Sequence, residues 1–225
     1  MENITPTIDR DLSKLIPPRA SVVYQLVSYC LVFPIFRILF RGDTSGTENV
    51  PLNGPVVVVA NHGSHLDPPL LGHALGRPVA FMAKAELFGI PVLGRIITMC
   101  GAYPVKRGAS DRGAIRNATS LLNKGWAVGV FLDGKRQANG RVNQPLSGAA
   151  LLAARSGAYL LPVAIVNSHR ALGRSSFFLR LVPISLRIGV PISPPVSRRK
   201  IDLEQTTNQL QQSINSMLEK GITVK

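Results

Sequence analysis

The chain has 225 residues and a formal net charge of +14, because 26 Lys and Arg outnumber 12 Asp and Glu. A hydrophobic content of 45% is enough for one domain with a real core, and the excess of cations indicates an anionic partner. Aromatic residues make up only 6%, and no RNP signature or zinc-finger spacing occurs, so we expect no nucleic-acid partner; two cysteines exclude a disulfide framework.

The most apolar run of the chain covers residues 22–40. Its length approaches that of a helix that spans a bilayer. The residues that interrupt it are Gln25, Ser28, Pro34 and Arg37. We therefore predict a helix that dips into a membrane or lies on its surface, kinked at Pro34. A helix packed on the protein's own core is nearly as well supported. Residues 1–45 are predicted to form a lead-in and this membrane-associating helix, and residues 46–225 an α/β domain.

A buried strand is predicted at residues 56–59, which are four consecutive valines. Branched side chains suit a pleated sheet, and no polar residue interrupts the run, so both faces of the strand are expected to be covered. The polar turn that follows contains Asn61, His62, Gly63 and Ser64. Asp67 is then predicted as the N-cap of a helix and Pro68 as its first residue. This places a polar cluster at the carboxyl end of a buried strand, where open α/β sheets hold their sites.

The pair His62 and Asp67 has the composition of a general base and its orienting carboxylate. A neutral imidazole can remove a proton from an alcohol, and a carboxylate can fix its tautomer. The chain has no G-x-S-x-G nucleophile elbow, so the hydroxyl that is activated is predicted to belong to a substrate. The simpler alternative is that Asp67 only caps a helix and His62 only bonds to loop backbone. The combined pattern favours chemistry.

Strands and helices are predicted to alternate along the rest of the chain. The predicted helices cover residues 68–75 and 91–100, then run from Ser110 or Asp111 to Leu122, from Ser147 to about Gly157, and from Asp202 to Gly221. The predicted strands cover residues 79–82, 102–105, 127–132 and 160–166, with one or two more within residues 177–192. Pro162 indicates a bulged strand or an edge strand. The alternation predicts an α/β fold with a mostly parallel sheet flanked by helices, preceded by the N-terminal membrane-associating helical segment.

Three polar clusters each follow a predicted strand. They lie at residues 62–67, at Lys106 and Arg107, and at residues 133–136. Because the carboxyl ends of parallel strands meet at one edge of a sheet, the three clusters are expected to converge there. Two cations beside Gly108 suit a phosphate group.

Four sequence blocks, taken in order, resemble the glycerolipid acyltransferase family, which includes the 1-acylglycerol-3-phosphate acyltransferases. The blocks are N-H-x-S-x-x-D at residues 61–67, K-x-E-L-F at 84–88, G-x-x-P-V-x-R at 101–107 and P-V-A-I at 162–165. A further family block, F-P-E-G-T-R, appears here as F-L-D-G-K-R at residues 131–136. Gly134 and Arg136 match it and Asp133 is analogous. This departure leaves the identity of the acyl acceptor open.

The resemblance implies transfer of a fatty acyl group to the sn-2 hydroxyl of 1-acylglycerol 3-phosphate, which gives phosphatidic acid. His62, oriented by Asp67, would deprotonate the hydroxyl, and the alkoxide would attack the thioester of the donor without an acyl-enzyme. Backbone amides near the turn would stabilise the oxyanion. The substrate-binding residues that the resemblance implies are Asn61, Ser64, Lys84, Lys106, Arg107, Asp133, Gly134 and Arg136.

The expected partners are all negatively charged or carry phosphate. They are anionic membrane phospholipid, a lysophospholipid acceptor, and acyl-CoA or acyl-carrier protein as co-substrate. No cofactor and no metal are expected, because H-x-x-H-x-D at residues 62–67 lacks known metal spacing and a metal would occupy the lone pair of His62. The protein is expected at the cytoplasmic face of a membrane. Two alternatives stay open: the same chemistry on another lysophospholipid or on glycerol 3-phosphate, and a non-catalytic lipid-binding protein.

Overall fold

One sheet organises the part of the chain that the computed structural model describes, which is residues 22–105, 112–173 and 178–220. Seven strands of these residues pair in the order β1-β7-β6-β2-β5-β3-β4. They are β1 (Asp43–Ser45), β2 (Val56–Ala60), β3 (Val79–Lys84), β4 (Tyr103–Val105), β5 (Ala127–Phe131), β6 (Tyr159–Val166) and β7 (Ser185–Ile188). Neighbouring strands are parallel except for β6 and β7. The predicted mostly parallel sheet is confirmed.

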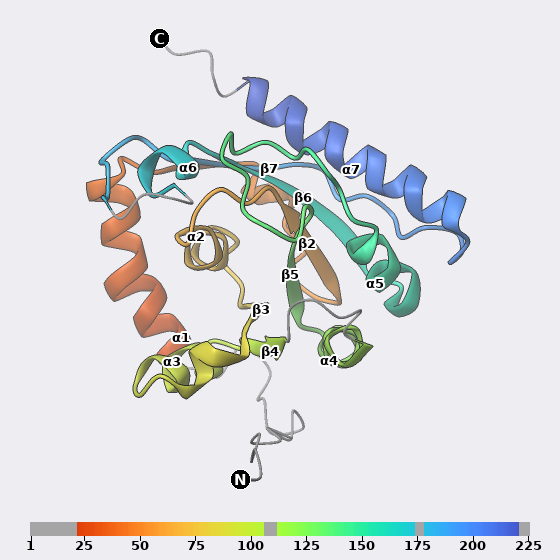
Figure 1. Cartoon of the computed structure of the whole chain (residues 1–225), viewed down its shortest axis with the longest axis horizontal. Helices are drawn as coiled ribbons and strands as arrows, with labels where there is room; N and C mark the ends of the chain where they lie inside the picture. Colours follow the sequence, from red (N-terminus) through yellow and green to blue (C-terminus); the bar gives the residue numbers. More distant parts are fainter. Residues whose placement is uncertain (1–21, 106–111, 174–177, 221–225) are drawn as a thin grey trace, which may run out of the picture.

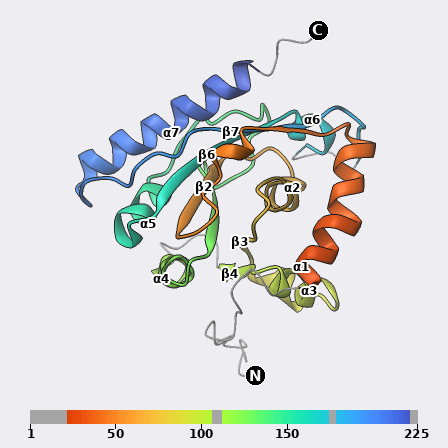
Figure 2. The ribbon, with the colours of Figure 1, turned by 180° about the vertical axis from the view of Figure 1, so that it is seen from behind.

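Helices cover both faces of this sheet (Figure 1). They are α1 (Val22–Leu26), the π-helical η3 (Val27–Val32) and η4 (Ile35–Leu39), α2 (Asp67–Ala74), α3 (Leu93–Met99), α4 (Arg112–Asn123), α5 (Gly148–Ser156), α6 (Ser168–Ala171) and α7 (Lys200–Lys220), with short 3₁₀ turns η5 (Thr47–Asn49) and η6 (Ala85–Gly89). The view from behind shows α4, α5 and α7 on one side of the sheet and α1, α2 and α3 on the other (Figure 2).

The valines of β2 divide between two cores, as expected for a strand buried on both faces. Val57 and Val59 pack with side chains of α4, α5 and α7. Val56 and Val58 pack with side chains of α2 and of the N-terminal helix. Every residue of β2 is buried, so the strand that leads to the predicted polar turn is anchored from both sides.

The N-terminal helical segment, α1 with η3 and η4, is partly packed and partly exposed. Among the described residues it alone is long and apolar enough to cross a membrane by length and composition. Its buried face rests on α2, where the Ser28 hydroxyl lies 2.9 Å from His73 Nδ1 and the ring of Phe36 lies 6.4 Å from the His73 ring. Pro34, where we expected a kink, separates the two π-helical segments. One face of the segment is therefore packed on the protein's own core, and the other face is exposed.

The expected domain boundary after residue 45 does not separate two units. β1 lies before it, yet pairs with β7 in the sheet. Phe36 and Phe40, from the N-terminal segment, are buried in the same core as Val56. The helical segment and the α/β sheet therefore share one core.

Two local predictions are refined by the structure. Of the two alternatives for the strand that contains Pro162, the edge strand is wrong, because β6 lies between β2 and β7. The bulge is supported, because residues 161–162 lie opposite residues 189–191 in the pairing with β7. The amide hydrogen that Pro162 lacks would face β7, and there the pairing is interrupted: Gly189 donates to the Pro162 carbonyl at 2.9 Å, and regular pairing resumes only at Ile192. The interruption therefore falls outside the β2–β6 ladder. The last helix, α7, begins before Asp202, whose carboxylate accepts a hydrogen bond from the Ser197 hydroxyl.

Candidate active site

His62 and Asp67 meet in the turn between β2 and α2. The Nδ1 atom of His62 lies 2.8 Å from Asp67 Oδ2. The backbone amides of Gly63 and Ser64 donate to the same oxygen, each at 2.8 Å. Asp67 is fully buried and is the first residue of α2, with Leu66 at the N-cap, so the predicted N-cap role is wrong. Its carboxylate instead accepts hydrogen bonds from two backbone amides of the same turn and from the imidazole of His62.

This geometry fixes the tautomer of His62. A carboxylate oxygen accepts, so Nδ1 carries the hydrogen and donates it to Asp67. The Nε2 atom then keeps its lone pair and can take a proton from an alcohol. The side chain of His62 is 13% exposed, which leaves part of the ring open at the end of β2. The dyad has the arrangement of a general base and its orienting carboxylate.

Aromatic stacking holds the plane of the imidazole. The His62 ring lies on the Phe131 ring with centroids 3.9 Å apart and planes 12° apart. Phe81 continues the stack on the other side, 5.9 Å from Phe131. The His62 carbonyl accepts a hydrogen bond from the Gln137 amide at 2.7 Å. The ring therefore has little freedom to rotate. Phe131 begins the F-L-D-G-K-R block, and its contact with His62 arises because it pairs with Ala60, the residue two before His62.

Asn61 extends the pairing of β2 with its side chain. The ladder of β2 on β6 ends where Ala60 is paired with Val163. Beyond that point Asn61 Oδ1 accepts from the Ile165 amide at 2.8 Å, and Nδ2 donates to the Ile165 carbonyl at 2.9 Å and to the Gly140 carbonyl at 2.7 Å. Asn61 is 1% exposed. Its amide thus connects β6 and the loop after β5 to the start of the catalytic turn, whereas the family resemblance implies a substrate contact.

Ser64 is likewise directed into the protein. It is fully buried, and its hydroxyl accepts a hydrogen bond from the Leu66 amide at 3.1 Å. The described contacts of Asn61 and Ser64 are therefore to backbone groups that shape the turn.

His169 packs behind the catalytic turn, where two glycines make room for it. A Cβ at Gly63 would lie 2.7 Å from the His169 Cβ, and a Cβ at Gly140 would lie 2.2 Å from its Nδ1 atom. Gly140 also has φ +66°, which disfavours other residues. Burial lowers the pKa of His169, as does Arg170, so the ring is favoured in its neutral form. Sequence reasoning missed this histidine, which follows the P-V-A-I strand without any local motif.

The loop after β5 is built around Asp133. Its carboxylate accepts hydrogen bonds from the Gln144 amide at 2.7 Å and the Asn143 amide at 3.2 Å, and the residue is 5% exposed. Gly134 has φ +63°, and Lys135 Nζ donates to the Gln144 side chain at 2.8 Å. Asp133 therefore organises the loop through backbone bonds, which a longer Glu would have to make from a different position.

Cations approach the dyad from neighbouring strands. Burial lowers the pKa of His65, and the positive charges of Arg136 and Lys84 lower it further. Lys84 is exposed at the end of β3, where it pairs with Val105 of β4. The predicted phosphate-binding residues Lys106 and Arg107 follow Val105 and lie outside the described residues. Within the described ranges, no group of three or more His, Cys, Asp or Glu could hold a metal ion.

The sequence and the fold are both similar to those of known acyltransferases. The family model described as Acyltransferase matches residues 41–166. The chain is 30% identical over 181 residues to the chloroplastic 1-acyl-sn-glycerol-3-phosphate acyltransferase BAT2 of Brassica napus, covering 78% of this chain and 52% of that protein. It is 23% identical over 200 residues to the 1-acyl-sn-glycerol-3-phosphate acyltransferase of Borreliella burgdorferi, covering 87% and 78%.

The chain spans about half the length of the plant relatives that it matches, 52% for BAT2 and 40% for the chloroplastic LPAT1 of Arabidopsis thaliana. The crystal structure of the 1-acyl-sn-glycerophosphate acyltransferase PlsC from Thermotoga maritima superposes with a TM-score of 0.73 at 23% identity, over 89% of this chain and 83% of that one. At this identity the likeness establishes a common fold.

Proposed function

This chain belongs to the acyltransferase family, and from that premise we propose that it transfers a fatty acyl group from acyl-CoA or acyl-carrier protein to the sn-2 hydroxyl of 1-acylglycerol 3-phosphate. The product is phosphatidic acid. The observation that carries the proposal is the contact of the partly exposed His62 with the buried Asp67, 2.8 Å apart, inside the matched region. Curated relatives named for this reaction support the choice of acceptor.

The reaction follows from the tautomer of His62. Its Nε2 atom takes the proton of the acceptor hydroxyl as the hydroxyl oxygen attacks the thioester carbonyl carbon. Asp67 stabilises the imidazolium that forms. When the tetrahedral intermediate collapses, the C–S bond breaks and the thiolate takes the proton back from His62. Among the described residues no serine or cysteine hydrogen-bonds the His62 ring, which favours direct transfer over an acyl-enzyme.

The acceptor phosphate has suitable cations around the dyad. Lys84 and Arg136 both lower the pKa of His65, which lies three residues after His62. Lys106 and Arg107 follow β4, next to β3 in the sheet. Guanidinium groups bind phosphate oxygens in pairs, and ammonium groups add charge. The formal net charge of +14 suits an anionic acceptor, an anionic donor and an anionic membrane alike.

The test is acyl transfer in detergent from labelled long-chain acyl-CoA, and separately from acyl-carrier protein, to lysophosphatidic acid. His62→Ala should lower kcat by about 10²–10⁴-fold, the range for loss of a general base. His73→Gln is the matched control, since His73 lies on α2 with its ring against the Ser28 hydroxyl. Full activity in His62→Ala would refute the mechanism. Inactive wild-type protein with every lysophospholipid and with glycerol 3-phosphate would refute the reaction and favour a lipid-binding protein.

A further inference from the structure

Three large apolar side chains stand out from the loop between α6 and β7. Phe178 is 82% exposed, Leu179 is 51% exposed and Leu181 is 55% exposed, and Arg180 lies among them. Single exposed apolar side chains are ordinary, but a contiguous group of them marks a surface that binds something. None of these three side chains belongs to either of the two cores that flank the sheet.

Hydrogen bonds hold the loop in this exposed position. The Arg180 amide donates to the Ala171 carbonyl of α6 at 2.8 Å. The Ile184 amide donates to the Phe40 carbonyl at 3.1 Å, and Ile184 itself is fully buried. Residues 180–184 are therefore tied at each end to packed parts of the protein. Leu181 lies between these two bonds, and Phe178 and Leu179 directly precede the first.

The same bonds place the loop beside the end of the N-terminal helix. Ile184 connects to Phe40 on one side, and the Asp43 amide donates to the Ile184 carbonyl at 3.2 Å. In this last part of the helix, Ile38 is 75% exposed and Leu39 is 42% exposed. Figures 1 and 2 show the loop, α6 and this helix end at one corner of the molecule. The exposed apolar side chains of the helix and of the loop thus form neighbouring surfaces.

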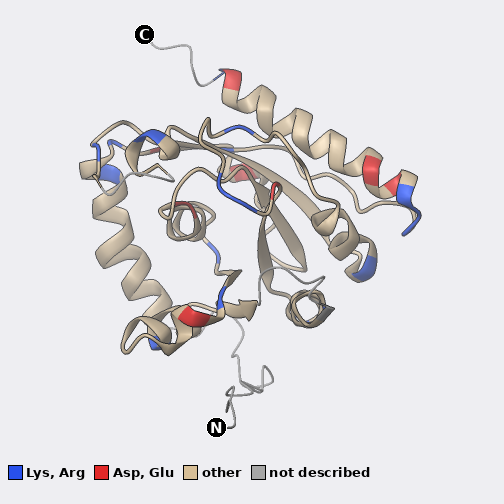
Figure 3. Cartoon of the chain, in the orientation of Figure 1, with Lys and Arg blue, Asp and Glu red and all other residues tan. Residues whose placement is uncertain are grey.

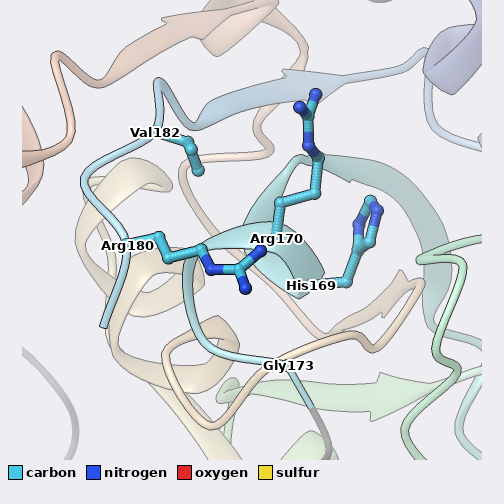
Figure 4. A pocket seen from close by; sticks show the side chains of 5 residues that line it. All are labelled: His169, Arg170, Gly173, Arg180 and Val182. Atoms are coloured by element: carbon cyan, nitrogen blue, oxygen red, sulfur yellow. The ribbon is translucent and has the colours of Figure 1, made fainter. Parts of the chain in front are cut away.

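Basic side chains border this apolar corner. A cavity of about 280 Å³ at the base of the loop is lined by His169, Arg170, Gly173, Arg180 and Val182. Figure 4 shows Arg180 reaching from the loop toward α6, while the Arg170 side chain points another way, so the two guanidinium groups can meet different headgroups. Lys and Arg also mark α6 and the nearby helix end in Figure 3. Apolar tips flanked by arginines match a lipid surface with anionic headgroups.

We propose that residues 178–182 form a second membrane anchor, in which Phe178, Leu179 and Leu181 enter an anionic phospholipid bilayer and Arg170 and Arg180 bind lipid phosphates. The inference deepens the proposed function, because a membrane-borne acceptor must reach His62. His169 connects the two regions, since it lines the cavity and packs against Gly63. Two separate contacts hold a protein on a bilayer more firmly and in a more defined orientation than one.

Insertion is measured directly with the full chain carrying Phe178→Trp. Trp126, the one tryptophan of the sequence, is buried, so emission that responds to lipid reports position 178. We expect quenching by brominated lipid in vesicles of phosphatidylcholine with phosphatidylglycerol. The matched control is Val196→Trp, because Val196 is 98% exposed on the loop that leads to α7. Quenching at neither position, or equal quenching at both, would overturn the proposal.

Binding to the same vesicles gives a second, independent measurement. Joint replacement of Phe178, Leu179 and Leu181 by Ser should weaken partitioning about 100-fold on any vesicle, from lost apolar burial. Joint Arg170→Gln and Arg180→Gln should weaken it about 30-fold on anionic vesicles and leave pure phosphatidylcholine unaffected. Unchanged partitioning of both variants would contradict the proposal. No acyl substrate is present in either measurement, so these results stand apart from those of the transfer assay.

Discussion

Replacement of Asn61 by Ala tests whether its amide holds the site together. The substitution leaves three buried groups without a partner: the Gly140 carbonyl and both backbone groups of Ile165. Each unsatisfied group costs about 1–3 kcal/mol, and water entering the vacated space recovers part of this. We therefore expect a loss of about 3–5 kcal/mol in the free energy of unfolding. For a chain of this size that lowers Tm by about 10 °C.

The assay is thermal unfolding followed by circular dichroism in detergent, with transfer kinetics on the same preparations. Asn139→Ala is the matched control, because Asn139 is an exposed amide in the same loop whose oxygen accepts from the Arg141 amide. It should cost about 1 kcal/mol or less. If Asn61→Ala melted like the wild type and only raised KM for the acceptor, Asn61 would be a substrate-binding residue and the reasoning from its backbone contacts would be wrong.

Two further predictions concern charge. Asp67→Asn keeps an oxygen for the Gly63 amide but removes the negative charge that faces the imidazolium, so kcat should fall about 10³–10⁴-fold while the protein stays folded; unchanged kcat would rule out the orienting role. Burial lowers the pKa of His65, His73 and His169 below the usual histidine value of 6.5. As pH falls through about 6.5 the unfolded chain takes up these protons before the folded chain does, so Tm should be highest above that pH and drop below it. A Tm that rises on acidification would contradict this.

The sequence was sufficient for the parts of the fold that local pattern determines. Four adjacent valines predict a strand that is buried on both faces, and β2 is such a strand. The polar turn after it, with His62 and Asp67, lies at the carboxyl end of that strand. The loop at residues 133–136 follows β5, which is the direct neighbour of β2, so these two clusters lie side by side as expected.

What the sequence could not show depends on contacts between distant residues. Asn61 bonds to Gly140 and Ile165, which are 79 and 104 positions away, so its partners are known only once β6 is placed beside β2. The stacking of Phe131 on His62 requires the register of β2 on β5. Pro162 suggested an edge because a missing amide hydrogen weakens a ladder, and only the structure reveals that the loss falls on the β7 side.

Several backbone amides of the site are bonded to side-chain oxygens rather than to other backbone groups, and three of them surround the catalytic turn. Gly63 and Ser64 donate to Asp67, and Ile165 donates to Asn61. Their exchange with deuterated solvent is therefore governed by rotation of two side chains, while the amides of β2 exchange only when the sheet opens. Residue-resolved hydrogen exchange can thus separate loosening of the catalytic turn from unfolding of the protein, without any substrate present.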